Sequence, residues 1–357
     1  MKLGKKLLAD LLKLEKTEEI DSVLEEFIDY RRITIPRRNG GYRILYVPSD
    51  PLKKLQKRIL NYFFYRIPVF PLCIGFRKKL SYVSNPRFHI NALSGRVKTV
   101  FRLDLKDAFP SVSSDYLKTC LKDIFLDEIK KYPKGRNEIS LFPVRRVKWF
   151  RELLRVEKAI ESLVGESSKI IEKLADLLVL LTTFEEKLPQ GAPTSPYLLN
   201  IVITQLGIGG KICGIMKDEF IDGEWALSIY ADDITVSTSR DFIPWKTRKR
   251  IIEAVESSGI FKVNREKTSY QKSKSIAPMI TGLRIVRING ETKVVLPKNK
   301  IRMIRGLIHR ARLNPDDIKL QFQAKGYLAM LKPIYGENIP KQILEPLLTK
   351  TIKSPAD

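Results

Sequence analysis

Apolar residues follow a helical period along the amino-terminal stretch and a strand period directly after it. In residues 1–30, leucines recur at spacings of three and four, which predicts an amphipathic helix. In residues 32–48, two β-rich runs flank an Asn-Gly step at Asn39 and Gly40, which predicts a β-hairpin. Residues 50–65 return to the helical period and carry one apolar side, formed by Leu52, Leu55, Ile59 and Phe63. The amino-terminal region is therefore predicted to fold as helix, hairpin and helix.

The rest of the chain alternates short strands with helices. A strand is predicted over residues 99–105, and a second hairpin is centred on Ala231 and Asp232. Short strands are predicted as far as residue 295. Helices are predicted over residues 114–186, 197 to about 216, 244–257 and from 300 onward. Without internal repeats, this order predicts an α+β fold with a helical appendage at its carboxyl end.

Three acidic residues stand out against this pattern. Asp232 and Asp233 are adjacent at the tip of the predicted hairpin, where their charges repel unless a cation compensates them. A solvated Asp-Asp turn is the alternative. Asp104 ends an apolar strand, and pairing of that strand beside the hairpin would bring the three carboxylates together. Such a group can hold two Mg²⁺ ions roughly 3.5 to 4 Å apart, the arrangement that supports phosphodiester synthesis.

Charge and cysteine content narrow the range of partners. The chain has 65 Lys and Arg against 40 Asp and Glu, a formal net charge of +25, so nucleic acid is the first partner to consider. Ribosome-associated proteins and proteins that bind anionic membranes are also basic. The three widely spaced cysteines predict neither a disulfide framework nor a zinc site. Without a signal peptide or a long apolar run, the chain is predicted to be cytoplasmic, with no membrane partner.

Several motifs together identify a resemblance to reverse transcriptases. Residues 102–111 resemble the first catalytic motif of that family, residues 189–196 its template and nucleotide platform, and residues 230–233 its metal-binding box. These motifs occur in the family's order and spacing. Residues 85–89 and 280–283 stand where bacterial retron enzymes carry two accessory signatures, with Pro86 and Ile280 as departures from them.

The resemblance implies a right-hand polymerase fold. Fingers are expected over residues 1–100, a palm over 101–285 with a helical insertion at about 115–186, and a thumb over 286–357. The implied activity is RNA-directed DNA synthesis from dNTPs, with two Mg²⁺ ions and Mn²⁺ as a substitute. The implied partners are a structured noncoding RNA that serves as template and primer, its DNA product, and an effector or toxin protein in anti-phage defence. Priming from a 3′- or a 2′-hydroxyl stays open.

The resemblance also assigns roles to individual residues. Asp104, Asp232 and Asp233 are the expected catalytic residues, and Leu105 joins them in the metal site. The expected substrate-binding residues are Arg43 at the triphosphate, Phe109 as a gate under the sugar, Gln190 and Gly191 under the template base pair, and Lys267 near the departing pyrophosphate.

RNA contacts are expected at the accessory motifs and on a basic helix. Residues 298–312 carry six Lys and Arg and no acid beside an apolar stripe, so one face would pack while the other faces RNA, although a solvated helix is the alternative. His89 could equally be a satisfied core histidine. The expected RNA-binding residues are Asn85, His89, Thr281, Gly282, Lys298, Arg302 and Arg305.

Other functions remain open from the sequence. An RNA polymerase of similar shape is disfavoured by Phe109, which leaves little room for a 2′-hydroxyl. Another bacterial defence enzyme or a group II intron-like reverse transcriptase would share the catalytic motifs. A non-catalytic RNA-binding or maturase-like protein would explain the positive net charge, but it would not require Asp104, Asp232 and Asp233.

Overall fold

The chain forms two compact units in the computed structural model. The first unit comprises Met1–Arg77, Leu105–Cys213 and Ile251–Asn264, and the second comprises Lys78–Asp104, Gly214–Arg250 and Arg265–Asp357. The chain therefore passes repeatedly between the two units. The structure describes residues 9, 14, 18–26, 28–36, 40–131, 167–274, 277–337, 339–340 and 343.

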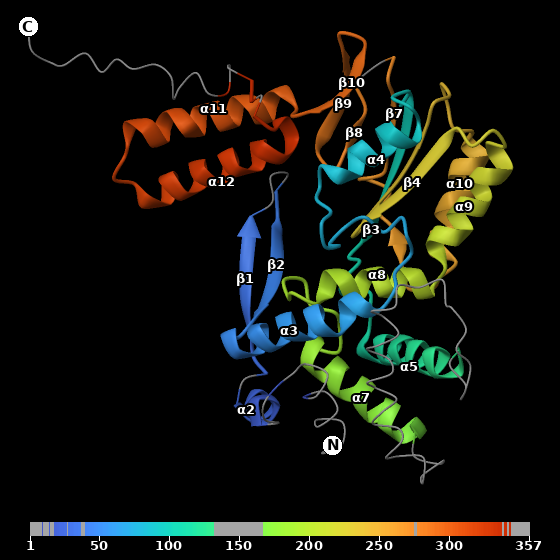
Figure 1. Cartoon of the computed structure of the whole chain (residues 1–357), viewed down its shortest axis with the longest axis vertical. Helices are drawn as coiled ribbons and strands as arrows, with labels where there is room; N and C mark the ends of the chain where they lie inside the picture. The colour runs from blue at the N-terminus through green and yellow to red at the C-terminus, as the bar shows by residue number, and fades with distance from the viewer. Residues whose placement is uncertain are drawn as a thin grey trace, which may run out of the picture. The chain divides into compact units, whose positions relative to one another are not determined.

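The first unit begins with a helix and the predicted hairpin (Figure 1). Helix α2 (Glu18–Glu26) precedes strands β1 (Tyr30–Pro36) and β2 (Tyr42–Pro48), which pair antiparallel from Tyr30 opposite Pro48 to Pro36 opposite Tyr42. Gly40 and Gly41, which directly precede β2, both have positive φ, a conformation that glycine adopts readily. Most of residues 1–17, where the leucine repeat begins, lie outside the described residues.

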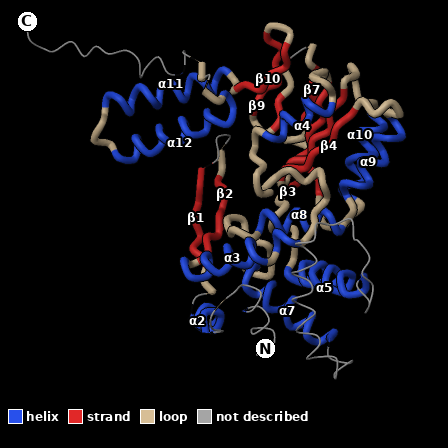
Figure 2. The backbone as a smooth tube through the Cα atoms, in the orientation of Figure 1, coloured by secondary structure: helices blue, strands red, loops and turns tan. Residues whose placement is uncertain are grey.

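Helices make up most of the rest of the first unit (Figure 2). The predicted apolar side of α3 (Asp50–Tyr62) is buried, including Phe63 just beyond its end. The predicted charged helical region contains α5 (Ser114–Lys131) and α7 (Ser167–Thr182), while residues 132–166 lie outside the described part. The single helix predicted over 197–216 is wrong: α8 (Ser195–Gln205) and α9 (Ile208–Glu219) are separate, because Gly207 adopts a φ of +64° between them.

An antiparallel sheet forms the core of the second unit. Its hairpin strands β4 (Trp225–Tyr230) and β5 (Asp233–Thr238) flank the predicted Asp-Asp turn, and β5 pairs with β3 (Thr99–Lys106). On its other side, β3 pairs with β7 (Ser269–Lys272). Leu105 and Lys106, the last residues of β3, belong to the first unit and pair there with β6 (Lys262–Val263). The strand and hairpin predicted from the sequence are thus confirmed as neighbours.

Helix α4 (Ser84–Ala92) packs against β4 in the second unit. Leu93 and Val97, which follow the helix, share a buried apolar cluster with Val100 of β3 and Ala226 of β4. Helix α10 (Trp245–Glu256) was predicted within one residue at each end. Beyond it, strands β8 (Met279–Ile280), β9 (Leu283–Ile288) and β10 (Glu291–Val295) form a second antiparallel sheet.

The carboxyl-terminal part of the described chain is a pair of helices, α11 (Lys298–Leu313) and α12 (Ile318–Tyr335). The apolar stripe predicted on α11 is buried at Ile304, Leu307, Ile308 and Ala311. Ile304 and Ile308 share a buried cluster with Leu331 and Ile334 of α12 and with Leu283 and Val294 of the second sheet. The finger, palm and thumb boundaries expected at residues 100 and 285 stay predictions.

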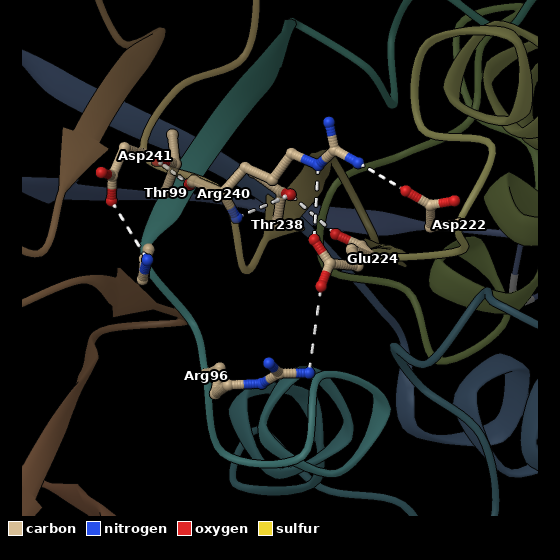
Figure 3. Close-up of polar contacts among 8 residues, drawn as sticks. Arg96, Thr99, Asp222, Glu224, Thr238, Arg240 and Asp241 are labelled. Carbon is tan, nitrogen blue, oxygen red and sulfur yellow. Dashed lines mark hydrogen bonds and ion pairs between the residues drawn. The ribbon is translucent and has the colours of Figure 1, made fainter.

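At one end of the first sheet, polar contacts tie β3, β4 and β5 together (Figure 3). Arg240 pairs with Asp222 at 2.8 Å and with Glu224 at 3.3 Å, and Thr99 donates a hydrogen bond to the Arg240 carbonyl at 2.8 Å. Thr238 donates to the Glu224 carbonyl at 2.7 Å. Exposed ion pairs contribute little stability individually.

Within the described residues, no single helix is both long and apolar enough to cross a membrane. Helices α8 and α9 pass that test of length and composition only as a pair, with a bend of 54° between them.

Candidate active site

The three predicted catalytic aspartates lie at one end of the first sheet of the second unit. The backbone register places Asp104 of β3 directly opposite Asp233 of β5, and Asp233 opposite Tyr230 of β4. Ala231 turns the hairpin with a φ of +55°, which puts Asp232 at its tip. The local pattern of two apolar strands around an acidic turn therefore brings together acids that are far apart in the sequence.

Two basic side chains accompany these acids. The Lys267 ammonium contacts both carboxylate oxygens of Asp104, at 3.1 and 3.3 Å, while Asp104 is only 9% exposed. The Arg102 Nε lies 3.9 Å from an Asp233 oxygen, close enough for electrostatic attraction but too far for a hydrogen bond. In this structure Lys267 is bound to Asp104, and its predicted place near the pyrophosphate stays a prediction.

The pKa of Asp233 is raised above the usual value for an aspartate. Burial raises the pKa of Asp233 to about 6, and the negative charges of Asp232 and Asp104 act in the same direction. Arg102 and Lys267 oppose that rise. A further cation at this position would favour the ionised carboxylate, as it does wherever acids crowd together.

The carboxylate oxygens of Asp104, Asp232 and Asp233 are suitable ligands for a divalent cation. Among the described residues, no three His, Cys, Asp or Glu side chains are close enough together to hold a metal ion. The register places Asp104 beside Asp233, and the Asp104 carboxylate binds the Lys267 ammonium. Carboxylate oxygens are the ligands that Mg²⁺ prefers. Metal binding stays a prediction.

The remaining predicted substrate-binding residues belong to the first unit. The Gln190 carbonyl accepts a hydrogen bond from the Tyr46 amide at 2.8 Å, which docks the platform loop on strand β2. Gly191 has a φ of +123°, and a Cβ at that position would lie 2.9 Å from the Tyr46 carbonyl oxygen. Only glycine suits this close approach. Arg43 is exposed on the same strand, β2.

Two further predicted residues follow Asp104 closely. Leu105 is buried and pairs with Val263 of β6. Phe109 lies in the turn after β3, with 7% of its surface exposed. Both belong to the first unit, and their roles in metal binding and sugar selection stay predictions.

The RNA-binding roles expected for Asn85 and His89 require correction. Both side chains lie on α4 and are fully buried, so neither can touch RNA in this structure. The His89 ring instead contacts the hydroxyl groups of Ser237 at 2.6 Å and Ser228 at 2.8 Å. The alternative, a satisfied core histidine, describes it correctly.

The other predicted RNA-binding residues remain accessible. Thr281 and Gly282 form the turn between β8 and β9, and the Thr281 hydroxyl donates a hydrogen bond to the Tyr82 carbonyl at 2.7 Å. Lys298 and Arg302 are exposed on α11, and Arg305 is partly exposed. Their contacts with RNA stay predictions.

Sequence reasoning missed the polar residues that surround the acids along the strands. Arg102, Ser228 and Ser237 received no role, although residues two apart on a strand share one face of a sheet. By that rule, Arg102 lies on the face of Asp104, and Ser237 lies on the face of Asp233. The signal was the polar residues at alternate positions of β3 and β5, such as Arg102 with Asp104 and Ser237 with Asp233, and the single serine within apolar β4.

Comparison with known proteins identifies the family. The model of the family described as "Reverse transcriptase (RNA-dependent DNA polymerase)" matches residues 35–279, more than half of the chain. The chain is 27% identical to the retron Mx65 reverse transcriptase of Myxococcus xanthus, over 88% of this chain and 64% of that protein. It is 26% identical to the retron Ec73 reverse transcriptase of Escherichia coli, over 84% and 81%. The chain thus spans less than two thirds of the length of the first of these relatives.

Among solved structures, apo telomerase from Candida tropicalis superposes with a TM-score of 0.43 and 16% identity, covering 75% of this chain and 55% of the telomerase chain. The family match includes the strands that carry Asp104, Asp232 and Asp233, and it ends at the beginning of β8. The chain belongs to the reverse transcriptase (RNA-dependent DNA polymerase) family, and the relatives that it resembles along most of its length are bacterial retron reverse transcriptases.

Proposed function

We propose that the chain is an RNA-directed DNA polymerase of the retron type. The observation that carries this proposal is the pairing of Asp104 with Asp233 beside the Asp232 turn, at the end of a family-matched sheet. The net charge of +25 supports a nucleic-acid substrate, because a polyanion is attracted to such a surface. The reaction is attack of a primer hydroxyl on the α-phosphate of a dNTP that is paired with an RNA template.

In this proposal, Asp104, Asp232 and Asp233 hold two Mg²⁺ ions, together with Leu105. When bound, the ions activate the attacking hydroxyl and stabilise the charge of the leaving pyrophosphate. The side chains of the three acids supply the negative charge that keeps the cations in place. Their position on two paired strands gives them a rigid frame, and a rigid frame is what catalytic positioning requires.

Other side chains would bind the substrates. Lys267 would leave Asp104 and turn its ammonium to the pyrophosphate, where it can stabilise or protonate an oxygen. Arg43 suits the triphosphate, since guanidinium offers paired donors to phosphate oxygens. Gln190 and Gly191 would support the template base pair on a loop that is fixed to β2. The basic residues Lys298, Arg302 and Arg305 of α11, with Thr281 and Gly282, would contact RNA.

The biological setting follows from the retron relatives and is part of the proposal. The template and primer would be a structured noncoding RNA, the product would be single-stranded DNA, and the system would act in anti-phage defence with an effector or toxin protein. Mn²⁺ would substitute for Mg²⁺, and the priming group is either a 3′- or a 2′-hydroxyl.

A primer-extension assay with matched ribo- and deoxyribonucleotides tests this function and the role of Phe109 together. The wild-type protein is expected to extend a DNA primer on an RNA template with dNTPs and Mg²⁺, and to reject rNTPs. Phe109→Ala is expected to weaken that preference by about tenfold to 200-fold, the range that a single pocket contact supplies. The reason is that the smaller side chain removes the clash with the 2′-hydroxyl.

The control is Phe125→Ala, which removes another buried ring of the first unit and should leave the preference unchanged. Loss of selectivity in both variants would assign the effect to general destabilisation. Preferential use of rNTPs by the wild-type protein would favour an RNA polymerase, and no extension under any condition would favour a non-catalytic RNA-binding protein.

A further inference from the structure

A buried histidine joins the two strands of the hairpin that carries Asp232 and Asp233. The His89 Nδ1 lies 2.6 Å from the Ser237 hydroxyl of β5, and its Nε2 lies 2.8 Å from the Ser228 hydroxyl of β4. All three side chains have an exposed fraction of 0%. One imidazole ring on α4 therefore bridges two strands of the sheet through both of its nitrogen atoms.

The bridged residues share a sheet face with the catalytic acids. Ser237 follows Asp233 by four residues along β5. Because side chains alternate between the two faces of a sheet, both lie on the same face. Ser228 stands opposite Thr235, which alternates on that same face. Asp104 is paired directly with Asp233. The two bridged serines, Asp104 and Asp233 therefore lie on one face of the sheet.

The chemistry of the three side chains suits a fixed connection. Burial lowers the pKa of His89 to about 3, so the ring is neutral at physiological pH. A neutral imidazole has one donor and one acceptor, and each serine hydroxyl can act as either. Both bonds can therefore form in either tautomer. Water cannot replace a lost partner easily, since none of the three side chains is exposed.

The bridge lies in the hairpin whose turn carries Asp232 and Asp233, where like charges would push the strands apart. Asp233 is paired with Asp104 and follows Asp232 directly, so three like charges lie near this end of the hairpin. The opposite end is already fastened by Arg240 and its acidic partners. Catalytic groups must be held to within about 0.5 Å of their working positions. Backbone hydrogen bonds fix the register of two strands, whereas a cross-strand bridge between side chains also limits their shear and twist.

We propose that His89 is a positioning residue for nucleotide addition, which locks β4 to β5 and thereby holds Asp232 and Asp233 in their working arrangement. The inference rests on the proposed polymerase function. On this inference, residues 85–89 of α4 affect the rate of the chemical step and do not contact RNA. A histidine that only stabilised the fold would affect melting but would leave the rate of the folded protein unchanged.

The test compares variants that remove or keep the bridge. His89→Leu removes both hydrogen bonds, whereas His89→Gln keeps an amide that can reach one serine. We expect His89→Leu to lower kcat at least tenfold, with the KM for dNTP and the Kd for primer–template changed less than twofold. His89→Gln should recover part of kcat. Each rate is measured well below the melting temperature of that variant.

Two further variants keep the test valid if His89→Leu does not fold. The double variant Ser228→Ala/Ser237→Ala removes both partners while changing little volume, and it should also lower kcat. The matched control is Gln56→Leu, which removes a buried amide that bonds to the Tyr30 hydroxyl and the Leu181 carbonyl in the first unit. It should lower the melting temperature without lowering kcat.

Hydrogen–deuterium exchange gives a readout that does not depend on activity. Amides of residues 225–238 should exchange at least tenfold faster in His89→Leu than in wild type, and at the wild-type rate in Gln56→Leu. Wild-type kcat in both the leucine variant and the double serine variant would overturn the inference, as would unchanged exchange. An inactive wild-type protein would instead count against the polymerase function, while the exchange result would still decide whether His89 fastens the hairpin.

Discussion

Asp233→Asn, and separately Asp232→Asn, is expected to lower the rate of DNA synthesis on an RNA template by on the order of 10³-fold or more. The expected loss follows from the several kcal/mol by which metal-bound carboxylates stabilise the transition state. Asn keeps the size of the side chain but removes the charge that a cation requires. RNA binding should remain nearly unchanged, because it depends mainly on Lys and Arg contacts with phosphates. Single-turnover extension and filter binding measure the two quantities.

The matched control is Asp222→Asn, which makes the same change at an exposed ion pair with Arg240 in the same unit. It should retain the wild-type rate of extension. Full activity of either catalytic-site variant in Mg²⁺ would contradict the proposed role of the acids. An equal loss in the Asp222 variant would show that the assay responds to charge or stability alone.

Lys267→Met is expected to reduce kcat by about 10²-fold or more, which is the lower end of the range for a positioned proton donor. Its ammonium contacts both oxygens of Asp104, so it can reach the leaving group only after that carboxylate has another cation. The apparent KM for Mg²⁺ should fall, because the metal then no longer competes with an ammonium for Asp104. Extension rates over a range of Mg²⁺ concentrations measure both effects.

Lys274→Met is the control for this substitution, since Lys274 forms an exposed ion pair with Asp241 in the same unit. It removes the same charge and should change neither kcat nor the Mg²⁺ requirement. A Lys267→Met enzyme with normal kcat would exclude a role for Lys267 in the chemical step. A raised KM for Mg²⁺ would show that Lys267 assists metal binding rather than competing with it.

The sequence predicted the elements whose signals are local. The first hairpin, the one-sided apolar pattern of α3 and the alternation around the Asp-Asp turn each depend on neighbouring residues. The structure confirms the strand pairing of both hairpins and the buried side of α3. Membership of the reverse transcriptase family also confirms the predicted right-hand polymerase fold. The break at Gly207 was missed because the apolar period continues across it, so that only the positive φ distinguishes two helices from one.

The sequence predicted the acidic residues of the candidate site, because each lies beside a recognisable apolar strand. It did not predict contacts between side chains that are far apart in the sequence. Asp104 and Asp233 could be paired in advance because Asp104 lies near the end of one apolar strand and Asp233 begins another. The contact of His89 with Ser228 and Ser237 joins residues separated by 139 and 148 positions, and serine is too common to indicate a partner. The pairing of Lys267 with Asp104 was likewise hidden, because it depends on how β7 follows β6 beside β3.

The most direct test of the central claim is an anomalous difference map from crystals of the protein with primer–template, a dNTP and Mn²⁺. We expect Mn²⁺ peaks ligated by carboxylate oxygens of Asp104, Asp232 and Asp233, with the Lys267 ammonium moved away from Asp104. The same crystals of Asp233→Asn should show these peaks weakened or lost. Mn²⁺ bound elsewhere, while Lys267 still occupies the Asp104 carboxylate in the complete complex, would contradict the account.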